Sequence, residues 1–119
     1  MTSDPVRLGI AGLGRAFMLT VPAFQADSRI RIVAAAAPRA DSRAAFEAQF
    51  GGRSYASVDE LAADVNLDVI YVATPHQMHA DHVIAGLRGG KHVIVDKPLS
   101  VSMEDADRMV AAAAETGCH

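Results

Sequence analysis

Two patterns of apolar and polar positions alternate along the chain. Short, continuous apolar runs are typical of strands that are buried on both faces of a parallel sheet. They predict strands over 6–11, 30–36, 54–55, 68–73 and 92–96, of which 54–55 is long enough only for an edge strand. Longer segments between these runs predict helices over 15–26, 41–50 and 75–88, a short helix from 57–60 onward, and a last helix after 102.

Capping residues mark several of the expected helix ends. Ser57 with Glu60, and Ser102 with Asp105, have the spacing of a capping box at a helix start. Glycine pairs follow the helices over 41–50 and 75–88, and Gly117 follows the last one. Proline at position 22 interrupts the first helix and predicts a kink there. The last helix carries an apolar stripe at helical spacing, formed by Ala106, Met109, Val110 and Ala113.

Alternation of strands and helices predicts an α/β fold, a doubly wound parallel sheet with helices on both faces. Right-handed crossovers leave few topologies, and we expect the strand order 3-2-1-4-5. The sequence has no internal repeat, no low-complexity tract and no linker. It ends where a sixth strand is expected to begin. We therefore expect residues 1–119 to be one domain, truncated before a sixth strand and a substrate domain.

Charge and composition narrow the expected partners. The chain has 11 basic and 14 acidic side chains, a net charge of −3, so no basic patch indicates nucleic acid. Cys118 is the only cysteine and cannot form an intramolecular disulfide. No apolar run approaches the ~18 residues of a membrane span, and residues 1–5 do not resemble a signal peptide. We expect a cytoplasmic protein without membrane or nucleic-acid partners.

A glycine turn follows the first expected strand. Gly12-Leu13-Gly14 links that strand to the helix predicted from Arg15. A strand, a glycine turn and a helix N-terminus together form a phosphate cradle, because backbone N–H groups and the helix dipole favour an anion. The third glycine of the dinucleotide-binding pattern is replaced by Phe17. Two glycines alone are equally compatible with an ordinary tight turn.

The fifth expected strand ends in charged residues. Val93 to Val95 leads directly into Asp96, Lys97 and Pro98. In open α/β sheets, ligands bind beyond the carboxyl ends of the strands. A lysine at this position is predicted to serve a ligand, because burying an unpaired ammonium beside a sheet core is costly.

Three motifs occur in one order along the whole chain: Gly12-Leu13-Gly14-Arg15, Tyr71-Val72-Ala73-Thr74-Pro75-His76-x-x-His79, and Gly90-Lys91-His92-Val93-x-x-Asp96-Lys97-Pro98. In this combination the chain resembles the nucleotide-binding domain of the glucose–fructose oxidoreductase / inositol dehydrogenase family (Gfo/Idh/MocA). Residues 8–17 with 74–77 are similar, more narrowly, to phthalate dihydrodiol (4,5-dihydroxyphthalate) dehydrogenases. The resemblance implies a Rossmann-like NAD(P)-binding domain.

Roles for individual residues follow from that resemblance. It implies cofactor binding by Gly12, Gly14, Arg15, Ala16, Phe17, Ala37, Arg39, Thr74, Pro75, His76, His79, Asp96, Lys97 and Pro98. It also implies a catalytic role for Lys97, close to the nicotinamide and the substrate. Asp96 stands where the family more often has Glu. The family's acid–base pair lies in a second domain that this sequence does not include.

The end of the second expected strand bears on the choice of cofactor. An acid there usually holds the ribose 2′-hydroxyl, but this chain has Ala37, followed by Pro38 and Arg39. Without the acid, a 2′-phosphate is not repelled, and Arg39 can pair with it. This favours NADP slightly over NAD. Arg39 as a simple solvated loop cation remains an open alternative.

Three histidines raise the question of a metal. On one helix His76 and His82 would lie ~9 Å apart along the axis, too far for both to join His79 around a zinc ion with bonds of ~2.0 Å. No cysteine or carboxylate completes a ligand set. We expect no metal site, with His76 at the helix start and His79 beside the cofactor.

These observations predict an NAD(P)-dependent dehydrogenase that oxidises a secondary alcohol or a cyclic diol, such as a phthalate dihydrodiol. Lys97 would stabilise charge on the substrate oxygen or relay its proton. The alternative is a nucleotide-sensing regulator with the same fold and no catalysis. We expect a small-molecule substrate, homo-oligomers formed through the missing domain, and no turnover by residues 1–119 alone.

Overall fold

The computed structural model describes residues 5–13, 22, 24–73, 79–95 and 103–117. Its strands are β1 (Val6–Ala11), β2 (Ile30–Ala36), β3 (Arg53–Tyr55), β4 (Val69–Val72) and β5 (His92–Val95). Its helices are α2 (Ala40–Phe50), α3 (Val58–Ala62), α4 (His79–Arg88) and α5 (Met103–Thr116). Each strand lies within one residue of its predicted bounds at either end. Of the helix predicted over 15–26, only residues 22 and 24–26 are described, and they are helical.

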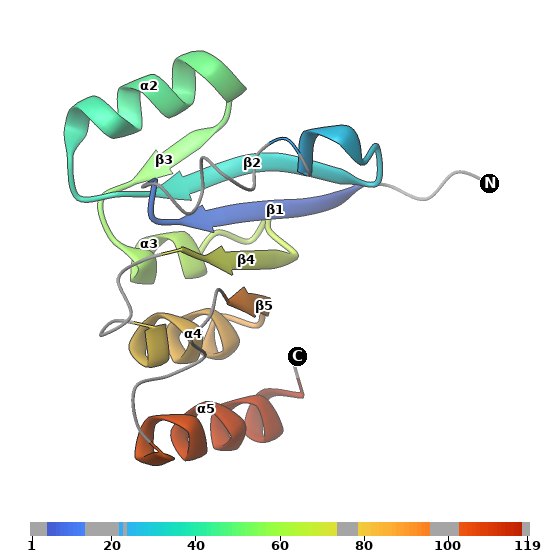
Figure 1. Ribbon diagram of the computed structural model, residues 1–119, viewed down its shortest axis with the longest axis vertical. Helices are drawn as coiled ribbons and strands as arrows, with labels where there is room; N and C mark the ends of the chain where they lie inside the picture. Colours follow the sequence, from blue (N-terminus) through green and yellow to red (C-terminus); the bar gives the residue numbers. More distant parts are fainter. Residues whose placement is uncertain (1–4, 14–21, 23, 74–78, 96–102, 118–119) are drawn as a thin grey trace.

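All strands of the sheet run parallel, in the order β3-β2-β1-β4-β5 (Figure 1). The predicted topology is confirmed. The apolar runs fill the middle of the sheet: Ile10, Ala35 and Ile70 are completely buried. Burial on both faces explains why these strands read as continuous apolar runs and not as alternating ones.

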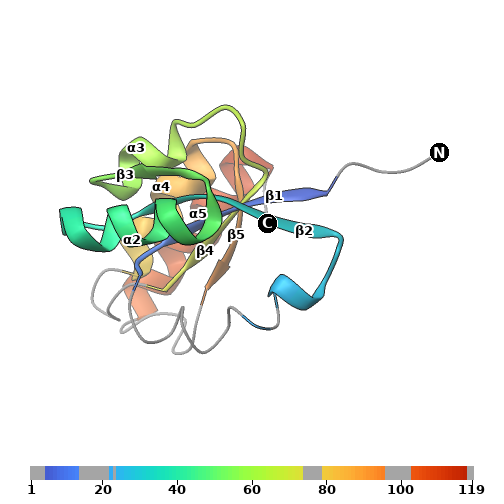
Figure 2. The same ribbon diagram turned by 90° about the horizontal axis from the view of Figure 1, so that it is seen from above.

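Helices cover the two faces of the sheet separately (Figures 1 and 2). On one face α3 and α4 pack through Leu61, Val83 and Leu87. On the other face Phe46 of α2 and the partly buried Phe24 pack over Leu8, Ile10 and Tyr71. The Phe24 and Tyr71 rings meet edge to face, with centroids 5.3 Å apart. The result is the three-layer arrangement expected of a doubly wound sheet.

The pairing of β1 with β2 contains an irregularity that the apolar pattern does not reveal. Leu8 pairs with Ile32 but Gly9 pairs with Ala34, so Val33 is an extra residue in β2. The Val33 carbonyl oxygen lies against Gly52, where an added Cβ would come within 2.3 Å of it. Glycine at position 52 therefore permits a close backbone approach that no larger residue would allow.

A buried carboxylate fixes the loop after α3 to β3. The Asp64 side chain, 3% exposed, accepts hydrogen bonds from Arg53 Nε (2.8 Å), Tyr55 Oη (2.7 Å) and the Asn66 backbone N–H (2.8 Å). The α3 N-terminus has the predicted cap, because Ser57 Oγ accepts from the Glu60 N–H at 3.2 Å. Cap and carboxylate together hold both ends of this short helix in place.

In the apolar stripe predicted for α5, Val110 is wrong, and the side chain of Ala106 lies outside the described residues. Met109 and Ala112 are buried and Ala113 is partly buried, but Val110 is 69% exposed. α5 packs against α4 and lies farthest from the strands (Figure 1), so only a narrow stripe of it is covered. Val110 lies outside that stripe.

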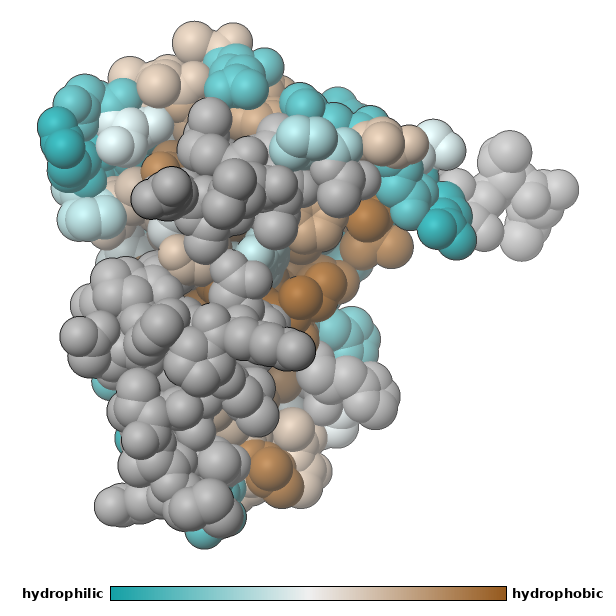
Figure 3. Space-filling view, in the orientation of Figure 1, coloured by the Kyte–Doolittle hydropathy of each residue, from teal (hydrophilic) through white to brown (hydrophobic). Residues whose placement is uncertain are grey.

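Apolar residues are also exposed elsewhere on the surface. Ile94 of β5 is 50% exposed. The face of the molecule drawn in Figure 3 shows apolar surface in its middle and over α5. No helix in the described ranges is long and apolar enough to cross a membrane.

Candidate functional site: a pocket at the carboxyl edge of the sheet

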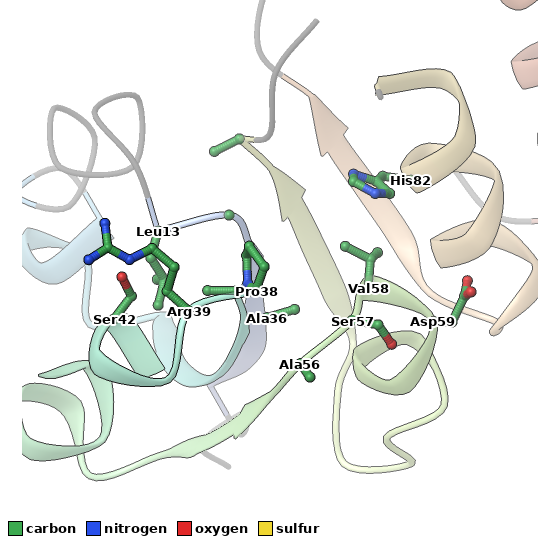
Figure 4. A pocket seen from close by; sticks show the side chains of 13 residues that line it. Leu13, Ala36, Pro38, Arg39, Ser42, Ala56, Ser57, Val58, Asp59 and His82 are labelled. Carbon is green, nitrogen blue, oxygen red and sulfur yellow. The ribbon is translucent and has the colours of Figure 1, made fainter. Parts of the chain in front are cut away.

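A pocket of about 510 Å³ lies at the carboxyl edge of the sheet, between the N-terminus of α2 and that of α3 (Figure 4). Its lining consists of Gly12, Leu13, Ala36, Ala37, Pro38, Arg39, Ser42, Ala56, Ser57, Val58, Asp59, Ala73 and His82. Parallel strands place the loops that follow them at one edge, so segments far apart in the sequence meet there. The volume falls within the ~300–1,000 Å³ of ordinary small-molecule sites.

The glycine turn forms one border of the pocket. Gly12 follows β1 directly and has a φ of 99°, in the left-handed region that favours glycine. Its backbone N–H donates to the Ala36 carbonyl at 2.9 Å, which ties the turn to the end of β2. Gly14, the second glycine of the turn, lies outside the described residues.

The segment after β2 forms the polar wall. Ala37, which takes the place of the usual acid, is 5% exposed, and its N–H donates to the Tyr55 carbonyl at 3.0 Å. Arg43 Nη1 donates to the Ala37 carbonyl at 2.7 Å. No carboxylate extends from position 37 into the pocket. Arg39 follows, with its exposed guanidinium beside the Ser42 hydroxyl (Figure 4).

Arg39 is held by a neighbouring acid. Its Nη2 lies 2.8 Å from Asp41 Oδ2, while Asp41 Oδ1 accepts from the Ser42 backbone N–H at 2.9 Å. The hydrogen bond from Arg39, followed by the one from Ser42, lowers the pKa of the Asp41 carboxyl below its ordinary value. The carboxylate is therefore anionic at neutral pH.

The opposite wall belongs to the start of α3. Val58 is 8% exposed and, with Ala36, gives the pocket an apolar floor, while Ser57 contributes its capping hydroxyl. His82 of α4 points toward Val58 and closes this side (Figure 4). An apolar slot between two polar rims suits a flat heteroaromatic ring joined to a sugar.

The structure brings three of the residues predicted as site residues into the pocket: Gly12, Ala37 and Arg39. His79 is the first residue of α4. The others lie outside the described residues: Gly14, Arg15, Ala16, Phe17, Thr74, Pro75, His76, Asp96, Lys97 and Pro98. Within the described ranges, no group of three or more His, Cys, Asp or Glu side chains could hold a metal ion.

Ten of the residues that line the pocket were not predicted as site residues: Leu13, Ala36, Pro38, Ser42, Ala56, Ser57, Val58, Asp59, Ala73 and His82. Ser57 could have been found, because its capping box begins two residues after β3, at the carboxyl edge where ligands bind. His82 carried no such signal, since its place in the pocket depends on how α4 packs on the sheet.

A parallel sheet with a glycine turn and a pocket at its carboxyl edge is the arrangement of dinucleotide-binding domains. Residues 6–119 match the oxidoreductase family with an NAD-binding Rossmann fold, Gfo/Idh/MocA. The chain belongs to this family and forms its nucleotide-binding domain.

Two enzymes illustrate the relatives. The chain is 41% identical over 113 residues to 1-carboxy-3-chloro-3,4-dihydroxycyclohexa-1,5-diene dehydrogenase from Comamonas testosteroni, covering 94% of this chain and 28% of that enzyme. It is 36% identical over 115 residues to trans-1,2-dihydrobenzene-1,2-diol dehydrogenase from Mus musculus, covering 94% of this chain and 34% of that enzyme.

A solved structure agrees with the fold over nearly the whole chain. A 3-ketoreductase from Actinomadura kijaniata, in complex with TDP-benzene and NADP, superposes with a TM-score of 0.89 at 32% identity. The match covers 97% of this chain and 37% of that one. The present chain thus spans about a third of the length of these relatives.

Proposed function

We propose that the full-length protein is an NAD(P)-dependent dehydrogenase that oxidises a cyclic diol or a related secondary alcohol. The observation that carries this proposal is the pocket at the carboxyl edge, in a chain similar to two dehydrogenases named for ring diols. The first of these substrates is also a carboxylate, which favours a phthalate dihydrodiol or a similar acid within the class. The relatives above are dehydrogenases and a reductase, so nothing favours a nucleotide-sensing regulator.

The pocket fits the adenosine half of the cofactor. Ala36 and Val58 would contact the adenine, and the Gly12 turn would receive the pyrophosphate with its backbone. Ala37 leaves room for a 2′-phosphate, and Arg39 and Ser42 offer it donors. These features support NADP as the preferred cofactor, the same cofactor that the 3-ketoreductase structure contains.

Catalysis requires a hydride acceptor and groups that stabilise the substrate oxygen and take up its proton. The bound nicotinamide would accept the hydride from the substrate carbon. Lys97, which follows β5 in the sequence, would stabilise negative charge on the substrate oxygen or relay its proton. A general base from a second domain would take up the hydroxyl proton, since the relatives are about three times as long as this chain.

Binding of the two cofactors tests the proposal. Calorimetric titration of the 119-residue chain should give a lower Kd for NADP⁺ than for NAD⁺. Arg39→Ala should raise the Kd for NADP⁺ about tenfold, the loss of one exposed charged hydrogen bond, and should leave NAD⁺ binding unchanged. Equal affinities for the two cofactors would refute the preference, and binding of neither would refute the assigned pocket.

Turnover tests the substrate class. The full-length protein, supplied with NADP⁺ and a panel of cyclic diols, polyols and sugars, should produce the absorbance band of the reduced nicotinamide with the diols. Turnover of sugars alone would refute the proposed class while leaving the family intact.

A further inference from the structure

Asp41 occupies the donors that a 2′-phosphate would need. Its Oδ2 lies 2.8 Å from Arg39 Nη2, and its Oδ1 accepts the Ser42 N–H in the first turn of α2. A phosphate beside Pro38 and Arg39 would bind the same guanidinium and the same helix N-terminus. The carboxylate of Asp41 thus resembles the phosphate in both charge and contacts.

We propose that Asp41 is a specificity-determining residue that weakens binding of the 2′-phosphate by pairing with Arg39, and so narrows the preference for NADP over NAD. This inference rests on the proposed function, because it concerns the same pocket. NADP must displace Asp41 from Arg39 before it binds fully. NAD has no phosphate at this position and leaves the ion pair intact.

The surroundings of the pair support a competition. Both side chains are largely exposed, at 76% for Arg39 and 67% for Asp41, so the pair can open without disturbing the core. Asp41 bonds Nη2 of the Arg39 guanidinium, one of the nitrogens that a phosphate would also engage, so the two anions compete for the same donor. An exposed ion pair is weak, which makes the competition graded and not absolute.

Asp41→Asn removes the negative charge of the side chain and keeps its size and shape. The amide keeps an oxygen for the Ser42 N–H but no longer holds Arg39 as an ion pair. The Kd for NADP⁺ should fall about three- to tenfold, from the loss of a competing ion pair. The Kd for NAD⁺ should stay within twofold of the wild-type value, about the precision of such a titration.

A control comes from a second arginine–aspartate pair, whose arginine is exposed and whose aspartate is partly buried. Asp27 and Arg29 also lie two residues apart, with Asp27 Oδ2 2.8 Å from Arg29 Nη2, and they precede β2 at the opposite edge of the sheet. Asp27→Asn changes the net charge equally and should leave both dissociation constants unchanged. A similar gain in this variant would show a general charge effect and overturn the inference.

A double variant, Arg39→Ala with Asp41→Asn, shows whether Asp41 changes the NADP⁺ affinity through Arg39. In the Arg39→Ala background, Asp41→Asn should give no further gain in NADP⁺ affinity, because the competing pair is already absent. A full gain in that background would show simple repulsion and refute the pairing, as would an unchanged Kd in Asp41→Asn alone. If the wild type prefers NAD⁺ but Asp41→Asn restores NADP⁺ binding through Arg39, the competition stands and the proposed cofactor preference fails.

Discussion

Replacing Asp64 by asparagine should destabilise the domain, because three donors converge on this buried carboxylate. Arg53 and Tyr55 both donate to Oδ2, and the Asn66 N–H donates to Oδ1. An asparagine in the same place offers one oxygen and one NH₂ group, so it can accept from only one side. Either Arg53 and Tyr55 or the Asn66 N–H then face the NH₂ group of the asparagine, which is itself a donor.

The expected loss follows from the bonds that change. Hydrogen bonds to a charged group contribute about 1.5–3 kcal/mol and neutral ones about 0.5–1.5. One bond is lost and the others weaken, and Arg53 is half exposed, which reduces its share through solvent screening. The free energy of unfolding should fall by about 2–3 kcal/mol, a decrease in Tm of roughly 6–12 °C for a domain of this size.

Denaturant unfolding followed by circular dichroism measures this loss. Asp59→Asn removes the same charge from an exposed position in α3 and should cause a much smaller change. Tyr55→Phe removes one donor and should cost about 1 kcal/mol, and less than that in the Asp64→Asn background, since the two side chains share one interaction. An unfolding midpoint for Asp64→Asn equal to that of the wild type would refute this account of the α3–β3 connection.

The pH dependence provides a separate check. Burial raises the pKa of the Asp64 carboxyl, but the hydrogen bonds from Tyr55, the Asn66 N–H and Arg53 outweigh it and leave the pKa below its ordinary value of 3.8. A carboxyl with a lowered pKa stabilises the fold above its unfolded-state pKa and loses that contribution as pH falls toward its folded-state pKa. The stability difference between wild type and Asp64→Asn should stay constant near neutral pH and shrink below about pH 4. A difference that persists at lower pH would contradict the assigned role of the charge.

Two further predictions concern the cofactor and the chemistry. Gly12→Ala should raise the Kd for NADP⁺ about tenfold or more, because alanine at a φ of 99° is strained by about 1–3 kcal/mol and the turn would shift. Gly51→Ala, at a φ of 71° with nothing within 4 Å of the added Cβ, should lose stability but keep the wild-type Kd for NADP⁺. In the full-length protein, Lys97→Ala should lower kcat far more than it changes cofactor affinity, measured by steady-state kinetics and titration, and an unchanged kcat would remove Lys97 from the proposed chemistry.

The amino-acid sequence determined the strands, their parallel arrangement and most helix ends. These features depend on local physics: apolar runs that can be buried on both faces, and a serine such as Ser57 that can cap the following turn. Glycines at the predicted helix ends have the positive φ that other residues rarely adopt, at 71° for Gly51 and 81° for Gly90. The sequence also shows that position 37 holds alanine and no acid, because this position directly follows the predicted second strand, which is β2.

Only the tertiary structure decided which distant residues meet. The burial of Met109 with exposure of Val110 depends on the angle at which α5 lies on α4, and the apolar pattern favoured both residues equally. The buried Asp64 and the pocket wall formed by His82 depend on loops and helices that pack across the sheet. Side-chain periodicity records which face of an element is apolar, but not which neighbour covers it.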